Sequence, residues 1–167
     1  HFLDKDVRSV IDIGGQDSKV IALDDGGKVR DFVMNDKCAA GTGRFLEVMA
    51  RALEVDLDSF GEFSLSAAKA SRISSLCTVF AESEVISLIA KGEARANIIA
   101  GIHDAVAARV AALANRIGVR SPLMMTGGVA KNIGVVKALE SRLGEIRVLP
   151  SAQVNGAIGA AVLAMQL

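Results

Sequence analysis

Three short β-strands joined by glycine-rich turns are predicted at the start of the sequence, and they restrict the fold more than any other feature. Residues 7–13 are rich in β-branched side chains and run into Gly14-Gly15. Residues 18–23 and 29–34 form two further apolar segments, separated by the turn signal D-D-G-G at 24–27. We therefore expect the chain to begin with an antiparallel meander.

After Cys38 the pattern changes, and most of the next eighty residues have the apolar spacing of helices. Strands then alternate with helices to the end of the sequence, which predicts an α/β fold with a mixed sheet flanked by helices. The predicted elements are helices at 43–55, 79–90 and 94–117, a strand at 122–126, a helix at 131–143, a strand at 146–149 and a helix at 155–165.

The composition limits what such a chain can be. The 167 residues suit one domain, and 51% of them are hydrophobic, which is enough for a core. The formal charge is zero, so we expect no nucleic-acid partner.

We find no apolar stretch near 20 residues and no secretory signal, which predicts a cytoplasmic protein without a membrane partner. The chain does not open with Met and a strand begins within seven residues, so we expect it to be part of a longer polypeptide.

The first glycine pair has the composition of a phosphate-binding turn. Gly14 and Gly15 allow backbone amides to approach a phosphate, because no Cβ stands in the way. Asp12 and Asp17 offer oxygens suited to Mg²⁺, and Gln16 would orient a water for attack on a γ-phosphate. A pattern as short as D-x-G-G is also typical of a plain hairpin turn.

A second glycine pair, Gly127-Gly128, follows the strand at 122–126 and precedes a helix, and Asn132 lies four residues on. Such a turn suits a ligand that rests on a helix start. The chain contains neither the P-loop pattern nor the Rossmann fingerprint. The order of the two glycine turns and the small-residue helix at 155–165 resembles the ribonuclease H-like ATPase fold of actin, Hsp70 and the sugar kinases. In that family these segments are the second phosphate loop, the adenosine loop and the second connecting helix.

Two cysteines, Cys38 and Cys77, each precede a predicted helix. A helix N-terminus stabilises negative charge and favours the thiolate that a metal needs. Two thiolates are half of the four ligands typical of an iron–sulfur cluster or a structural zinc site, so a site shared across a two-fold axis is one interpretation. Two buried structural thiols are the other.

Residues 35–45 (N-D-K-C-A-A-G-T-G-R-F) and 77–87 (C-T-V-F-A-E-S-E-V-I-S) resemble the signature segments of the 2-hydroxyacyl-CoA dehydratase activators and of the benzoyl-CoA reductase ATPase subunits. The resemblance implies a homodimeric ATPase of anaerobic metabolism with one [4Fe-4S] cluster at its interface, held by Cys38 and Cys77 of each subunit. It further implies ATP or ADP with Mg²⁺, an electron donor such as ferredoxin or flavodoxin, and transfer of the electron to a dehydratase or acyl-CoA reductase.

The resemblance covers only part of that family's architecture. The half-domain that carries the first phosphate loop is not in residues 1–167, so we expect this chain to be the second lobe of the ATPase fold. The segment Gly41-Thr42-Gly43 follows Cys38 closely, and we expect it to face the nucleotide and to link the two sites.

Two other functions stay open at this point. A sugar or small-molecule kinase of the same fold would bind ATP without a cluster, and its two cysteines would be incidental. A non-catalytic interaction domain would keep the fold without nucleotide turnover.

Overall fold

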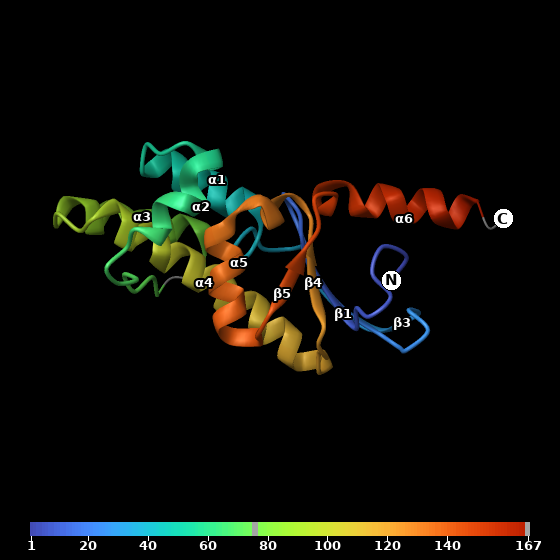
Figure 1. The fold of residues 1–167 in the computed structure, drawn as a ribbon. Coiled ribbons are helices and arrows are strands. Elements are labelled where there is room, and N and C mark those ends of the chain that lie inside the picture. Colours follow the sequence, from blue (N-terminus) through green and yellow to red (C-terminus); the bar gives the residue numbers. More distant parts are fainter. Residues whose placement is uncertain (75–76, 166–167) are drawn as a thin grey trace.

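A computed structural model describes residues 1–74 and 77–165 of the chain, and a five-stranded mixed sheet lies at its centre (Figure 1). The strand order is β3-β2-β1-β4-β5. The first three strands pair antiparallel, as the meander predicts, whereas β4 is parallel to both β1 and β5. The strands are β1 (Ser9–Ile13), β2 (Ser18–Leu23), β3 (Val29–Asn35), β4 (Leu123–Thr126) and β5 (Ile146–Val148).

Alternation along the strands divides the sheet into two unequal faces. Ile11 pairs with Val20 on one side and with Met125 on the other, and all three are fully buried in the main core. The opposite face holds a smaller cluster around Val7, Leu23 and Met124. The main core therefore lies on a single face of the sheet.

Helices cover that face, and Figure 1 shows α4 and α5 beside the sheet with α1, α2 and α3 beyond them. The predicted helices form within a few residues of their expected bounds, and Gly118 ends α4 in the left-handed region (φ 61°). The sequence did not predict α2, although Asp56 supplies an N-cap by accepting from the Asp58 amide at 3.3 Å. The helices are α1 (Gly43–Ala52), α2 (Leu57–Leu65), α3 (Thr78–Ala90), α4 (Arg95–Ile117), α5 (Ile133–Leu143) and α6 (Asn155–Ala164).

The expectation that no stretch approaches the length of a membrane span is wrong for α4. Its 23 residues are long and apolar enough to cross a membrane by length and composition. However, 56% of its most apolar 18-residue stretch is buried within the fold, where Ile98, Ile102 and Val106 pack in the main core. The apolarity of α4 is thus that of a central core helix.

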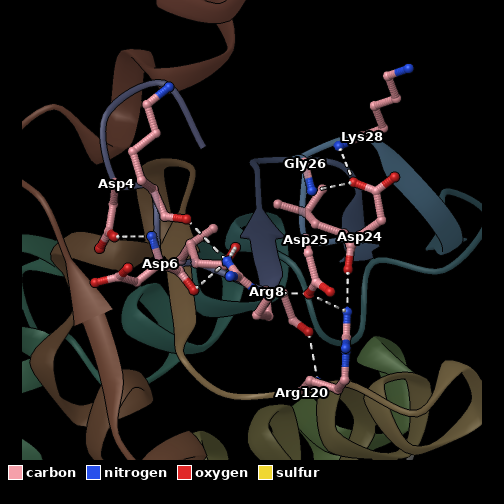
Figure 2. A network of polar contacts seen from close by, with 12 residues as sticks. Asp4, Asp6, Arg8, Asp24, Asp25, Gly26, Lys28 and Arg120 are labelled. Carbon is pink, nitrogen blue, oxygen red and sulfur yellow. Dashed lines mark hydrogen bonds and ion pairs between the residues drawn. The ribbon is translucent and has the colours of Figure 1, made fainter.

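Polar contacts around the β2–β3 turn fasten the end of the sheet that lies near the C-terminus of α4 (Figure 2). Arg8 and Arg120 approach Asp25 at 3.3 and 3.6 Å, and the Asp24 carboxylate accepts from the Gly26 amide at 2.9 Å. Because Asp25, the shared partner of both arginines, is largely solvated, the contacts fix the turn's position more than they add stability.

Helix α6 extends away from the rest of the molecule (Figure 1). None of its residues is buried, and Leu163 is 65% exposed. The neighbouring sheet face also exposes Phe32 on β3. These apolar groups lie on the side of the sheet opposite the main core.

Candidate functional site

The two glycine pairs meet because they follow neighbouring parallel strands. β1 ends at Ile13 and β4 at Thr126, and the carboxyl ends of parallel strands lie at one edge of a sheet. A cavity of about 300 Å³ opens at this edge. It is lined by Gly14, Gly15, Gly43, Leu46, Glu47, Leu57, Asp58, Gly128, Val129, Lys131, Asn132 and Gln153.

Five of the predicted binding residues therefore come together, namely Gly14, Gly15, Gly43, Gly128 and Asn132. Apart from Gly43, no local pattern indicated the cavity residues that α1 and α2 contribute, which are Leu46, Glu47, Leu57 and Asp58. Only the packing of those helices brings them to the sheet edge.

The first glycine turn is bonded to the start of α1. The amides of Gly43 and Arg44 donate to the carbonyls of Gly14 and Gly15, both at 2.8 Å. The turn itself closes through the Gly14 amide, which donates to the Asp17 carbonyl at 2.9 Å. Any displacement of the turn therefore acts directly on α1 and on the segment that precedes it.

The second glycine pair differs from the prediction, because a 3₁₀ turn, η1 (Gly128–Lys131), stands between it and α5. Gly127 has φ 86°, and a Cβ built there would lie 2.3 Å from the Ile13 carbonyl oxygen. Only glycine fits so close an approach of two backbones. Gly127 thus acts by allowing the contact with β1, and it does not line the cavity.

The carboxylates beside the first turn have a partner that was not predicted from the sequence. Asp12 accepts from the Thr126 hydroxyl at 2.6 Å and lies 3.9 Å from the Lys19 ammonium, which also pairs with Asp17. Lys19 stands opposite Asp12 in the β1–β2 register. Cross-strand pairing was the signal that would have identified it.

The remaining predicted residues lie near the cavity without lining it. Gln16 is exposed at the tip of the first turn. Gly41 has φ 91° and packs beside the Arg109 side chain. Thr42 is fully buried, and its hydroxyl donates to the Ala39 carbonyl at 2.6 Å. Of the segment expected to face a ligand, only Gly43 does so.

Asn132 lines the cavity, but its side-chain amide is engaged within the fold. Its Oδ1 accepts from the Val135 amide at 3.1 Å and caps α5. Its Nδ2 lies 3.3 Å from Nε2 of His103, a residue for which the sequence predicted no role. Asn132 therefore shapes the cavity wall more than it offers free polar atoms to a ligand.

The two cysteines occupy different environments. Cys77 is exposed and is the N-cap residue of α3, as predicted, and its side chain makes no capping hydrogen bond. Cys38 is half-buried against the core and precedes α1 by five residues, so it does not stand directly before that helix. Within residues 1–74 and 77–165, no group of three or more His, Cys, Asp or Glu side chains is placed to hold a metal ion.

The segment before Cys77 is tied to α3. The Glu84 carboxylate accepts from the Ser74 amide at 3.0 Å and from its hydroxyl at 2.9 Å. Beside Cys77, Val79 and Phe80 are 65% and 67% exposed. The exposed thiol thus lies beside two exposed apolar side chains.

Comparison with known proteins places this geometry in a family. The model of the BadF/BadG/BcrA/BcrD ATPase family matches residues 1–164. An activator of lactoyl-CoA dehydratase from Anaerotignum propionicum is 54% identical over 99% of the chain and 64% of its own length. A benzoyl-CoA reductase subunit from Thauera aromatica is 36% identical over 96% of the chain and 60% of its own length. The chain thus spans just under two thirds of these curated relatives.

Solved structures agree with the fold. The (R)-2-hydroxyglutaryl-CoA dehydratase component A of Acidaminococcus fermentans has a TM-score of 0.93 at 56% identity, covering 97% of this chain and 62% of that one. The 2-hydroxyisocaproyl-CoA dehydratase activator of Clostridium difficile, solved with bound ADPNP, has a TM-score of 0.93 at 51% identity, covering 96% and 60%. The ethanolamine utilization protein EutJ from Carboxydothermus hydrogenoformans has a TM-score of 0.51 at 15% identity, covering 90% of this chain and 46% of that one. At so low an identity, the likeness supports the fold and nothing further. The predicted ATPase fold is confirmed.

Proposed function

The chain belongs to the BadF/BadG/BcrA/BcrD ATPase family, and from that membership we propose that it is the nucleotide- and cluster-binding lobe of an ATP-driven electron-transfer activator. The partner would be a 2-hydroxyacyl-CoA dehydratase or a related acyl-CoA reductase, since the relatives are named for such enzymes. We further propose that the protein acts in the cytoplasm as a homodimer and takes electrons from ferredoxin or flavodoxin.

The observation that carries the proposal is the cavity at the ends of β1 and β4. Gly14 and Gly15 of the first turn line it, and a Cβ at Gly15 would meet nothing within 4 Å, which suits the approach of a phosphate chain. Leu57 and Val129 provide apolar surface for the nucleoside. A relative with bound ADPNP supports the assignment of the ligand as ATP or ADP.

The charged groups beside the turn give the site its proposed phosphoryl chemistry. Asp12 and Asp17 would hold Mg²⁺, directly or through water. Lys19 forms ion pairs with both carboxylates and offsets one of their two charges, and we expect its ammonium to turn toward the phosphates when the metal binds. Gln16 would orient the attacking water from the tip of the turn.

The donor set fits a cluster shared between two chains. One copy offers only Cys38 and Cys77 as thiolate ligands, and two copies offer the four that a [4Fe-4S] cluster requires. Cys77 is exposed at the start of α3, so its thiol would be accessible to a cluster held at the subunit surface. When bound, the cluster would supply the one-electron chemistry that protein side chains lack.

A physical connection between the two halves of the proposed activity runs through α1. The bonds from Gly43 and Arg44 to the glycine turn link the phosphate end of the cavity to the segment that contains Cys38. A change in the turn on hydrolysis would therefore move that segment, and it would favour one arrangement of the two subunits over another.

Anaerobic iron and sulfide analysis together with ATP-dependent reduction of an acceptor tests the proposal on the whole protein. We expect about four iron per dimer, lost in Cys38→Ser, and reduction that requires ATP. A folded dimer that binds ATP but no iron after reconstitution would contradict electron transfer and favour the kinase interpretation. Iron without ATP-dependent reduction would instead favour a non-catalytic binding domain.

A further inference from the structure

A buried histidine, His103, joins three helices behind the nucleotide cavity. It lies on α4 and is 1% exposed. Its Nδ1 is 3.0 Å from the Ser64 hydroxyl on α2, and its Nε2 is 3.3 Å from the Asn132 amide nitrogen at the start of α5. The Phe60 ring packs against it edge-on, with ring centroids 5.3 Å apart.

The hydrogen bonds around His103 determine which atom donates and which accepts in each contact. The Ser64 hydroxyl donates to the Gly61 carbonyl at 2.7 Å, so its oxygen accepts from the Nδ1–H of His103. His103 Nε2 is then free to accept from Asn132 Nδ2, and that arrangement leaves Asn132 Oδ1 to cap α5. A neutral imidazole with the proton on Nδ1 satisfies all four groups.

The surroundings favour that neutral form. Burial lowers the pKa of His103 from 6.5 to about 4. The groups that contact the ring, Ser64 and Phe60 on α2 and Asn132 with Gly134 at the start of α5, are uncharged. The ring therefore stays an acceptor at Nε2 throughout the physiological pH range.

Two glycines make this contact possible and fix its geometry. A Cβ at Gly134 would lie 2.3 Å from His103 Nδ1, and one at Gly61 would lie 2.8 Å from Asn132 Oδ1. The backbone of α5 therefore approaches the His103 ring, and the backbone of α2 approaches the Asn132 amide, as closely as sterics allow. Two stretches of the cavity wall continue from these points, Leu57 and Asp58 at the start of α2 and Asn132 itself.

We infer that His103 is a positioning residue for nucleotide binding, which holds Asn132 and the start of α2 in the relative placement that the nucleotide requires. The inference rests on the proposed function, since it assumes that the cavity binds ATP. His103 does not line the cavity, so it acts through Asn132 and Ser64. With His103 in place the cavity wall is ordered before binding, so the nucleotide does not have to assemble it.

Nucleotide affinity and steady-state kinetics on the whole protein test this role. His103→Leu removes both ring hydrogen bonds and leaves Asn132 Nδ2 without its acceptor. We expect Kd for ADP and KM for ATP to rise about tenfold or more, with kcat nearly unchanged. His103→Gln, which retains a neutral donor and acceptor, should restore Kd to within about threefold of the wild type. Val110→Ala, another fully buried position on α4, is the matched control for lost stability and should leave KM unchanged.

The outcomes separate the inference from the function on which it rests. Tight binding by the wild type with an unchanged Kd in folded His103→Leu would overturn the positioning role and leave the proposed function standing. An equal rise in KM for Val110→Ala would also overturn it, because lost stability alone would then explain the effect. Absence of ADP binding by the wild type would overturn both. If His103→Leu fails to fold, His103→Phe and the Gln rescue provide the same comparison.

Discussion

The nucleotide cavity and the cysteine segments are built in opposite ways. The part of the cavity that this chain contributes is held by internal contacts: the first glycine turn is bonded to α1, the carboxylates beside that turn are paired with Lys19, and Asn132 is held by His103. The cysteines are not brought into a ligand set within the described residues, and Cys77 is exposed beside Val79 and Phe80. In the cavity region the polar groups just named are paired within the chain, whereas the cysteine region has a thiol and apolar side chains on its surface.

From this difference we expect the two proposed activities, nucleotide binding and cluster binding, to depend on different assemblies. The residues of this chain that line the cavity are already in place, so we expect ligand binding to cost little ordering of these residues. A cluster at the cysteines would need a second copy of the chain to supply two more thiolates and to cover the apolar surface. Variants should therefore affect one region and spare the other.

The largest effect is expected from Cys77→Ser. We expect iron content to fall from about four per dimer to none, because a hydroxyl does not replace the thiolate ligand. Isothermal titration should give the same Kd for ADP as in the wild type, since Cys77 does not line the cavity. A parallel loss of ADP affinity would show that the two regions are not separable.

A stability effect of about 3 kcal/mol is expected from Gly127→Ala. The new Cβ would lie 2.3 Å from the Ile13 carbonyl oxygen, and φ at this position is 86°. Chemical denaturation should show the loss. Gly128→Ala is the matched control, because a Cβ there meets nothing within 4 Å, and its free energy of unfolding should change by less than about 1 kcal/mol. Equal losses in the two variants would be inconsistent with this account of the turn.

A smaller effect, about 2 kcal/mol, is expected from lowering the pH from about 7 to about 5. The pKa of His103 is lowered from 6.5 to about 4 by burial, so the unfolded chain binds this proton more readily than the folded one. Its contribution to stability is therefore complete above about pH 6.5 and is lost as the pH falls toward 4.

His103→Gln provides the reference for that measurement, because it keeps the hydrogen-bonding groups without the titration. The difference in unfolding free energy between the two proteins should shrink as the pH falls. A difference that stays constant between about pH 7 and pH 5 would mean that His103 does not remain neutral in the folded state.

The smallest effect concerns Thr42, which lies between the two regions. Its buried hydroxyl donates to the Ala39 carbonyl, so Thr42→Val should cost about 1 to 2 kcal/mol of stability, and Thr42→Ser should recover most of it. Nucleotide affinity should not change in either variant. If Thr42→Val weakens ADP binding and Thr42→Ser does not, the hydroxyl faces the ligand when the nucleotide is bound.

Much of the fold was predictable because its signals are local. Apolar runs beside glycine turns predicted β1, β2, β3 and β4, a short apolar run predicted β5, and apolar spacing with Gly118 predicted α4. The misses have physical reasons. The Asp56 cap is the main local signal for α2, and a single cap residue does not define a helix. The 3₁₀ turn after Gly127 depends on contacts with β1 and with the Ala152 carbonyl.

The sequence alone determined the chemistry that this chain has available: two glycine turns in order, two carboxylates beside the first, and two cysteines within long family-specific segments. The tertiary structure decided which of these groups meet. Parallel pairing of β1 with β4 brings the glycine turns to one cavity, and antiparallel register sets Lys19 opposite Asp12. Packing of α2, α4 and α5 buries His103 between Ser64 and Asn132. Such contacts join residues far apart in the chain, so they follow from packing geometry and not from any local pattern.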